Sequence, residues 1–400
     1  MNILQITPRF PYPLKDGGAL GYYNFTKGYH DAACTVTLAS LNTSKHFVNY
    51  EELPNEIKSL AEIHLTFIDN GVKPIDAFLN LFTNKSYNIS RFISTEFENA
   101  LIDLCQKKTF DVIVFESIFV APYLDVIRKY SNAICVLREH NVEYEIWQGL
   151  AENESNIFKK AYLKLLAYRL KKFEIKQLNL FDCVTTVTKN DENEFRKLGC
   201  NKPIFTAATG VDLNRLQIDN SEIEMPSLFH IGSMDWLPNC EALKWFIDNV
   251  WEHIHLKYPE LKFYIAGRNM PSVFFEYNNQ KNIKIIGEVE DALRFMQQKA
   301  IMVVPLFSGS GIRIKILEGM ALGKCIVSTS LGLQGIDATN GKEIFVAETA
   351  NDFLTKIDFL LQNQNLILET GFAARKLIKE KYDTKLIIER TLNFYKSIKK

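Results

Sequence analysis

The sequence predicts an α/β protein made of two Rossmann-like domains, each with a parallel β-sheet covered by helices on both faces. The chain has 400 residues, which is more than one hydrophobic core usually organises. Its hydrophobic content of 47% and charged content of 24% are ordinary for a globular protein. In both halves, short and nearly continuous apolar runs alternate with helix-length segments. Parallel strands give this pattern because both of their faces are buried.

Strands are expected at each of these β-branched runs. Those of the first half lie at 2–6, 34–39, 62–68, 111–116, 133–138 and 182–187. Those of the second half lie at 226–231, 261–266, 282–286, 300–305, 324–328 and 343–347. After the first strand of the second half, apolar residues recur at helical spacing up to Ile254, and Asn239 is the expected N-cap of that helix. The periodicity is lost over 201–226, which predicts a domain boundary there.

Charge and cysteine usage exclude several classes of protein. Basic and acidic residues both number 47, so the basic excess typical of nucleic-acid-binding proteins is absent and no nucleic-acid partner is expected. The seven cysteines form no CxxC pair and have no metal-ligand spacing, as is usual in a reducing cytosol. The first apolar run ends at Pro8 without the features of a signal peptide, and no apolar stretch approaches the length of a membrane span. We therefore expect a cytoplasmic location.

The most informative segment is 303–328, which predicts a phosphate site. A strand is expected to end at Pro305 and a helix to begin near Ile312, with a glycine-serine loop between them that contains Gly309, Ser310 and Gly311. Arg313 and Lys315 then fall in the first turn, where free backbone N–H groups and the positive end of the helix dipole already gather. Two cations at that place are unfavourable unless an anion binds there.

Glu318 lies three residues after Lys315 and so about one turn deeper on the same helical face. A carboxylate at this depth suits the two hydroxyl groups of a ribose. The alternative is that Lys315 and Glu318 form an ordinary surface pair and that the loop is only a turn. That alternative leaves the glycines unexplained.

Three further positions follow expected strands. Gly17 and Gly18 open a helix after the first strand and could let a diphosphate or a sugar approach the backbone, although a flexible turn explains them equally well and no GxGxxG fingerprint is present. His140 follows the strand at 133–138, at the carboxyl end where ligands of parallel sheets bind, and is expected to be functional. Gly232 follows the first strand of the second domain, beside the expected phosphate position. Asp235, Trp236 and Asn239 are interpreted as bracing that loop.

Several motifs in fixed order resemble a known enzyme family. They are HNVE (140–143), TGVD (209–212), HIGSMDWLPN (230–239), IAGR (265–268), GEVED (287–291) and GSGIRIKILEGMALGKCIVST (309–329). Together they resemble the retaining GT-B glycosyltransferases of the family-four type, a group of bacterial polysaccharide and glycoconjugate enzymes. The resemblance extends over almost the whole chain and is most specific in its C-terminal part.

The resemblance implies a GT-B fold, with two facing Rossmann-like domains and an interdomain cleft. Residues 1–205 would form the acceptor-side domain, completed by a crossover helix at 384–400, and residues 206–383 the nucleotide-sugar-binding domain. The residues implied to bind the donor are Gly17 and Gly18 near the diphosphate, His140 at the transferred sugar, Arg313 and Lys315 on the diphosphate, Glu318 on the ribose, and Gly287 to Val289 at the base. Ser310 stands where the family usually has a glutamate. The second domain also lacks the basic pair that many relatives carry after its first strand, and Arg313 would compensate.

The activity implied is transfer of a sugar from a nucleotide diphosphate sugar to a glycan or lipid-linked acceptor. It would proceed with retention of anomeric configuration and without a metal or other cofactor, in the synthesis of cell-surface polysaccharides or glycoconjugates. The lack of an Asp-rich metal motif agrees with this. The alternatives are a nucleotide-sugar epimerase, a phosphorylase and a non-catalytic sugar-nucleotide-binding protein, which Ser310 favours. A nicotinamide dehydrogenase is disfavoured because the glycine fingerprint is missing.

The sequence gives fewer indications of where the acceptor binds. Residues 74–93 mix apolar and polar side chains and could line it. Residues 157–176 predict a basic amphipathic helix with seven Lys or Arg residues. This helix could hold the protein at the inner face of an anionic membrane, or it could be a domain helix with a solvated basic face.

Overall fold

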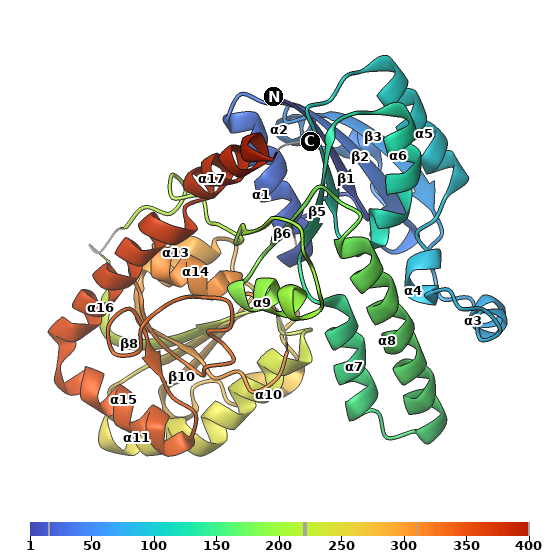
Figure 1. Ribbon diagram of the computed structural model, residues 1–400. Coiled ribbons are helices and arrows are strands. Elements are labelled where there is room, and N and C mark those ends of the chain that lie inside the picture. The colour runs from blue at the N-terminus through green and yellow to red at the C-terminus, as the bar shows by residue number, and fades with distance from the viewer. Residues whose placement is uncertain (15–16, 219–221, 310, 399–400) are drawn as a thin grey trace. The chain divides into compact units, whose positions relative to one another are not determined.

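The computed structural model describes residues 1–14, 17–218, 222–309 and 311–398 (Figure 1). The chain divides into two compact units, which we describe separately. Unit 1 contains residues 1–208 and 387–400, and unit 2 contains residues 209–386. The boundaries expected from the sequence, at 205 and 384, each differ from these by three residues.

Unit 1 is built on a seven-stranded sheet in the order β3-β2-β1-β4-β5-β6-β7, in which every neighbouring pair is parallel. The strands are β1 (Asn2–Thr7), β2 (Thr35–Thr43), β3 (Glu62–Ile68), β4 (Val112–Glu116), β5 (Ile134–Glu139), β6 (Cys183–Thr186) and β7 (Ile204–Thr206). All the strands predicted in the first half are present. The sequence missed β7, a three-residue strand at the edge of the sheet that is too short to show a period.

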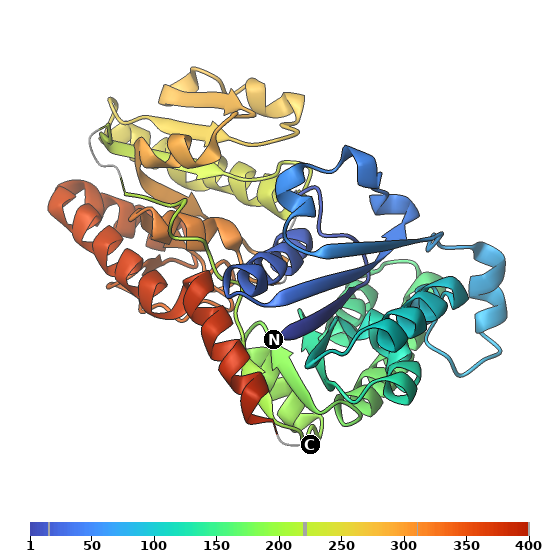
Figure 2. The same cartoon turned by 90° about the horizontal axis from the view of Figure 1, so that it is seen from above.

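The helices of unit 1 cover both faces of this sheet (Figures 1 and 2). They are α1 (Gly17–Asp31), α2 (Asn55–Lys58), α3 (Pro74–Asn80), α4 (Tyr87–Ser90), α5 (Thr95–Lys107), α6 (Leu124–Tyr130), α7 (Glu143–Asn153), α8 (Ile157–Leu178), α9 (Lys189–Lys197) and most of α17 (Thr384–Ser397). Alternate strand residues point to opposite faces, and both faces are buried. Val112 packs in one core cluster and Ile113 in the other. This explains the apolar runs from which the strands were predicted.

The helix expected over 384–400 is observed as α17, and it packs beside α1 (Figure 2). The hydroxyl groups of Tyr395 and Tyr29 lie 3.2 Å apart in the interior. Gly28 of α1 lies so close to Ile388 that any side chain at position 28 would overlap it. Residues from α1, α17, β1, β4, β5 and β6 share one hydrophobic cluster. The helix is therefore part of the core of unit 1.

Unit 2 is built on a six-stranded parallel sheet in the order β10-β9-β8-β11-β12-β13. The strands are β8 (Glu224–Ile231), β9 (Phe263–Ala266), β10 (Ile283–Gly287), β11 (Lys299–Val304), β12 (Cys325–Ser328) and β13 (Phe345–Val346). The helices are α10 (Leu237–Phe246), α11 (Glu252–Lys257), α12 (Ser272–Phe275), α13 (Ala292–Gln297), α14 (Ile314–Ala321), α15 (Ala350–Gln362) and α16 (Gln364–Leu377). The predicted fold class of two parallel-sheet Rossmann-like domains is confirmed.

Two details of the predicted helices were wrong. Helix α10 begins at Leu237 with Trp236 as its N-cap, and Asn239 lies inside the first turn. Pro238 is well tolerated there because the first turn needs no N–H donor, so the helix starts before the expected asparagine. Helix α14 begins at Ile314, two residues later than expected, with Arg313 as its N-cap.

The described residues contain neither a candidate membrane span nor a cluster of metal ligands. No helix in this part of the chain is long and apolar enough to cross a membrane. Within the same residues, no group of three or more His, Cys, Asp or Glu side chains is placed to hold a metal ion.

Candidate active site

In unit 2, the loop between β11 and α14 brings together most of the residues predicted to bind phosphate. Gly309 and Gly311 have φ angles of +102° and +84°, which glycine adopts without strain. A Cβ atom at Gly309 would also lie 2.6 Å from the Trp236 ring. Both conformation and packing therefore require glycine at position 309. Ser310, another predicted donor contact, lies outside the described residues.

Arg313 and Lys315 are held at the start of α14 by two residues from the start of α10. The Arg313 side chain is buried, and its guanidinium lies 5.1 Å from the centre of the Trp236 ring. The Lys315 Nζ atom donates a hydrogen bond of 2.9 Å to Asn239 Oδ1. The sequence interpretation of Trp236 and Asn239 as loop braces was incomplete, because both position a cation of the candidate site.

The environment disfavours the charged form of both side chains. Burial, together with the charge of Arg313, lowers the pKa of Lys315 to about 7. Burial also lowers the pKa of Arg313. Among the described residues, Lys315 forms no ion pair with a carboxylate. A partly buried cation without a negative partner is unfavourable, so the site favours the binding of an anion.

Glu318 lies on the same helix and is half-buried. Burial raises the pKa of its carboxyl group to about 7, an effect that the charge of Arg215 only partly offsets. Lys315 bonds to Asn239, and within the described part of the chain its Nζ makes no ion pair with Glu318. The alternative reading of Lys315 and Glu318 as a surface pair was therefore wrong. The carboxyl group remains able to accept hydrogen bonds from a ligand.

Gly232 lies directly beside Lys315. A Cβ atom at this position would lie 3.1 Å from Lys315 Nζ and 2.8 Å from Asn239 Nδ2. A side chain here would therefore crowd both Lys315 and Asn239. His230, two residues earlier, donates through Nδ1 to the carbonyl of Val303 at 2.9 Å. Burial and the charge of Lys315 lower its pKa to about 3, which keeps the imidazole neutral. His230 was not singled out from the sequence.

Gly287 and Val289, which were predicted to contact the nucleotide base, lie at the end of another strand of the same sheet. Gly287 ends β10 with a φ angle of +73°, and its carbonyl accepts a hydrogen bond of 2.7 Å from the N–H of Gly267. Val289 is half-buried in the loop that follows. Strand β10 is separated from β8 by β9, so these residues are not in the immediate surroundings of Lys315. Their roles stay predictions.

In unit 1, His140 follows β5 and belongs to a buried polar network. Its Nε2 atom lies 2.8 Å from Glu116 Oε2 and 2.9 Å from Arg138 Nη1. Arg138 also donates to Glu116 Oε2 at 2.9 Å, and its guanidinium lies 3.5 Å from the centre of the Phe25 ring. Gln5 donates to the other carboxylate oxygen of Glu116 at 2.8 Å. The imidazole is thereby fixed in one orientation.

The charges in this network keep His140 neutral. Burial and the charge of Arg138 lower its pKa, and these effects outweigh the attraction of Glu116. For Glu116, burial raises the pKa, but the charge of Arg138 and the hydrogen bond from His140 bring it below its ordinary value. Glu116 is therefore ionised, and the side chains of Glu116 and Arg138 are both fully buried.

The predicted glycines of unit 1 are at the beginning of α1. Gly17 and Gly18 form its first turn, where Gly17 is exposed and Gly18 half-buried. The glycine that approaches His140 is Gly21, one turn later, where a Cβ atom would lie 3.3 Å from His140 Cε1. Gly21, Glu116 and Gln5 were not predicted from the sequence. A signal was present, since Gln5 and Glu116 are polar residues within otherwise apolar strands.

Comparison with known proteins connects this geometry to a family. Residues 225–363, most of unit 2, match the model of the family described as glycosyl transferases group 1. The loop before α14, with Arg313 and Lys315, lies within the matched residues. The resemblance to GT-B glycosyltransferases of the family-four type is confirmed.

Relatives and solved structures align with the whole chain. A Klebsiella pneumoniae protein described as an uncharacterized 44.6 kDa protein in the cps region is 23% identical over 405 residues, which cover 96% of this chain and 97% of the relative. Sucrose-phosphate synthase from Thermosynechococcus elongatus superposes with a TM-score of 0.69 at 13% identity, covering 99% and 98% of the two chains. Anabaena HepE in complex with UDP and glucose superposes with a TM-score of 0.66 at 12% identity, covering 98% and 99%. These likenesses show the GT-B fold.

Proposed function

We propose that this protein transfers a sugar from a nucleotide diphosphate sugar to a glycan or lipid-linked acceptor, with retention of anomeric configuration. The observation that carries the proposal is the pair of cations at the start of α14, of which Arg313 is buried and Lys315 half-buried. Lys315 has no carboxylate partner among the described residues, and glycines with positive φ lie directly before it. A diphosphate would supply the missing negative charge.

The chemistry follows from the charges that form in the transition state. Breaking the bond between sugar and phosphate builds negative charge on the leaving diphosphate and positive charge on the sugar carbon. Arg313, Lys315 and the free N–H groups of α14 stabilise the leaving group in a fixed arrangement, which removes the need for a metal ion. His140 contacts the transferred sugar. The acceptor hydroxyl attacks on the face of the leaving group, a phosphate oxygen takes its proton, and no residue acts as a covalent nucleophile.

The relatives support a donor and a biological setting of this kind. HepE was crystallised with UDP and glucose, and the Klebsiella pneumoniae relative is named for a cps region. We propose that this protein acts in the same way on a nucleotide sugar, in the synthesis of a cell-surface polysaccharide or glycoconjugate. The carboxyl group of Glu318 would bind the ribose of that donor.

A panel of UDP, GDP, ADP and TDP sugars tests the donor. One nucleotide class is expected to raise the thermal midpoint by several degrees, since a ligand at 100 times its Kd adds about 2.7 kcal/mol of stability. Product analysis with acceptors then distinguishes a transferase from an epimerase, which alters the donor without an acceptor, and from a non-catalytic binding protein. Absence of any nucleotide effect would contradict the donor site. An inverted product anomer in an NMR spectrum would contradict the mechanism.

We also propose a cytoplasmic location with peripheral contact to the inner face of the membrane through α8. Helix α8 is longer than the predicted segment by two residues, and all of its buried residues lie between Leu166 and Leu178. The expectation of a continuous amphipathic face was therefore wrong for its first half. That half projects with α7 as a hairpin (Figure 1), and exposes Ile157 by 73% and Phe158 by 84% beside two lysines. Such a tip suits an anionic bilayer surface.

Liposome flotation tests this contact. The wild type is expected to float with vesicles that contain an anionic lipid and to remain unbound with purely zwitterionic vesicles. The double change Ile157→Ser and Phe158→Ser should abolish flotation, because it removes the apolar anchor. Phe372→Ser, which alters another exposed aromatic residue in unit 2, is the matched control. Equal absence of binding to both vesicle types would reject the proposal.

A further inference from the structure

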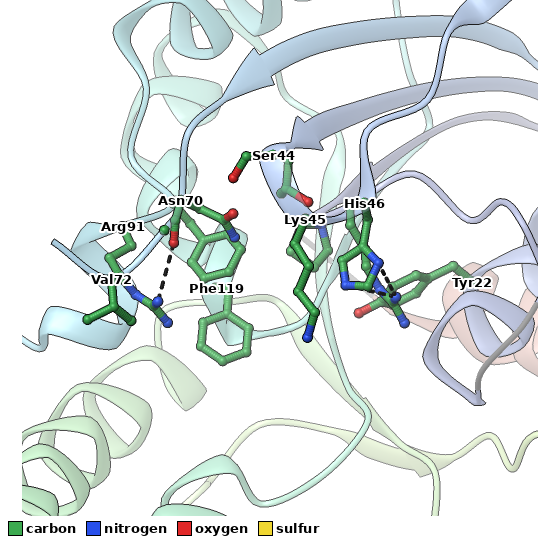
Figure 3. Close-up of a pocket in the computed structure, with 13 residues that line it drawn as sticks. Tyr22, Ser44, Lys45, His46, Asn70, Val72, Arg91 and Phe119 are labelled. Atoms are coloured by element: carbon green, nitrogen blue, oxygen red, sulfur yellow. Dashed lines mark hydrogen bonds between the residues drawn. The ribbon is translucent and has the colours of Figure 1, made fainter. Parts of the chain in front are cut away.

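Unit 1 contains a pocket of about 450 Å³ at the carboxyl end of its sheet (Figure 3). Its walls come from the segments that follow β1, β2 and β3 and from the loop around Arg91. These are the positions at which parallel sheets bind their ligands. Two of its lining residues, Arg91 and Phe92, belong to the segment 74–93 that was expected on the acceptor side, and the others were not predicted to bind the acceptor.

The lining of the pocket is basic. Arg9, Lys45, His46 and Arg91 all contribute to it, and no aspartate or glutamate among the described residues does. In Figure 3, the Lys45 side chain extends between Phe119 and His46. The nearest acid in sequence, Asp69, accepts a hydrogen bond from Ser44 and pairs with Lys73 at 3.2 Å, so its charge is already compensated. A ligand in this pocket therefore meets an excess of positive charge.

The contacts inside the pocket also favour an oxyanion. The Nη1 atom of Arg9 lies 3.4 Å from both ring nitrogens of His46, so two basic groups are held together. Thr43 is 1% exposed, and its hydroxyl has no hydrogen-bond partner among the described residues. An unpaired buried hydroxyl is unfavourable and would be satisfied by an acceptor oxygen of a ligand.

Two aromatic side chains also line the pocket. The rings of Phe92 and Phe119 have centroids 4.9 Å apart and are tilted by 32°. Val72, which also lines the pocket, is 67% exposed. A sugar ring has an apolar face that packs against aromatic side chains, whereas its substituents need polar partners. The pocket thus combines a surface for a sugar ring with a basic surface for a charged substituent.

The pocket borders the candidate catalytic histidine. Tyr22 lines the pocket and also packs edge-to-face against His140, with ring centroids 4.7 Å apart. The charge of Arg9 also contributes to lowering the pKa of His140. A ligand held here would therefore lie near the position at which the proposed reaction takes place.

We propose that this pocket binds a phosphate or carboxylate group carried by the acceptor, with Arg9, Lys45 and His46 contacting the oxyanion and Phe92 and Phe119 contacting a sugar ring. The inference rests on the proposed function, since it names the class of acceptor that the transferase uses. The acceptor is accordingly an anionic saccharide or a sugar attached to a phosphate group.

Calorimetric titration of the full chain with matched probes tests the inference. Glucose 6-phosphate and glucuronate are expected to bind at least about tenfold more tightly than methyl α-glucoside, because a hydrogen bond to a charged group adds about this factor. Decyl phosphate distinguishes the two possible sources of the oxyanion. Binding of decyl phosphate indicates a lipid phosphate. If the charged sugars bind and decyl phosphate does not, the oxyanion belongs to a glycan. The pair of changes Arg9→Gln and Lys45→Gln should remove the preference for charge. Lys107→Gln, an exposed lysine that pairs with Asp103, should retain it.

The outcomes separate this inference from the donor site. Equal binding of neutral and charged sugars, binding of none of the probes, or an unchanged preference in the Arg9→Gln and Lys45→Gln protein would overturn it. Lys315→Met should leave the binding of charged sugars unchanged, which shows that the donor phosphate site does not account for it. If the wild type binds the charged sugars but no nucleotide, the proposed transferase function fails while the oxyanion pocket stands.

Discussion

Replacing Lys315 with methionine is expected to stabilise the unliganded protein and to abolish binding of the donor. Methionine has a similar length and needs no negative partner. The pKa of Lys315 is lowered from 10.5 to about 7, chiefly by burial, so the charged form destabilises the fold. A shift of this size corresponds to about 2–4 kcal/mol at neutral pH after allowance for partial solvent contact.

The gain in stability has a defined pH dependence. Because the folded pKa lies below the unfolded one, the destabilisation by Lys315 is complete below pH about 7. It decreases as the pH rises from about 7 and disappears near the unfolded value of 10.5. Thermal unfolding of wild type and variant across this range measures the difference. Lys244→Met, which removes an exposed lysine paired with Asp248, should change stability little at any pH.

Donor binding is expected to change in the opposite direction. Arg313→Ala and Lys315→Ala should each weaken nucleotide sugar binding by about 100-fold, because each removes a charge-assisted contact to the diphosphate. Titration with the nucleotide that the panel identifies provides the measurement. A stabilised Lys315 variant that still bound the donor normally would mean that the cation serves another purpose, and the phosphate site would be rejected.

Changing Glu116 to glutamine is expected to destabilise unit 1 by about 3–5 kcal/mol, because it leaves the fully buried Arg138 without its carboxylate. Glutamine keeps the size and the contact with Gln5, so the loss reports the charge and not a cavity. His140 also loses the acceptor that fixes its ring. Transfer activity should therefore fall along with stability.

Hydrogen exchange of peptides from β4 and β5 during urea unfolding would measure this loss within unit 1. The matched control is Glu62→Gln, which alters an exposed carboxylate paired with Lys108 and should cost at most about 1 kcal/mol. Similar protection in both variants would show that the buried pair contributes little to the stability of unit 1.

The fold could be predicted from the sequence because its strands are buried on both faces. Each such strand produces a continuous apolar run, and every run selected proved to be a parallel strand. The pattern fails where burial is incomplete, as in the edge strand Ile204–Thr206. It also fails at helix starts, where Pro238 displaced the expected cap.

The candidate site was only partly predictable. Arg313 and Lys315 were recognisable because glycines, a helix start and two cations are adjacent in the sequence. The residues that position them are distant, since Asn239 lies 76 positions before Lys315. The partners of His140 are distant as well, with Glu116 separated by 24 positions. Such contacts depend on the order of strands in the sheet, which local patterns do not reveal.

The packing of α17 on unit 1 has a consequence for biosynthesis. The ribosome makes α17 only after all of unit 2, so the surface formed by Ile3, Tyr29 and Val136 stays uncovered while nearly two hundred further residues are translated. During that interval the nascent chain carries an apolar surface that would attract chaperones or neighbouring nascent chains. Folding of unit 1 is thus completed late, and a protein that ends before α17 would keep this apolar surface exposed permanently.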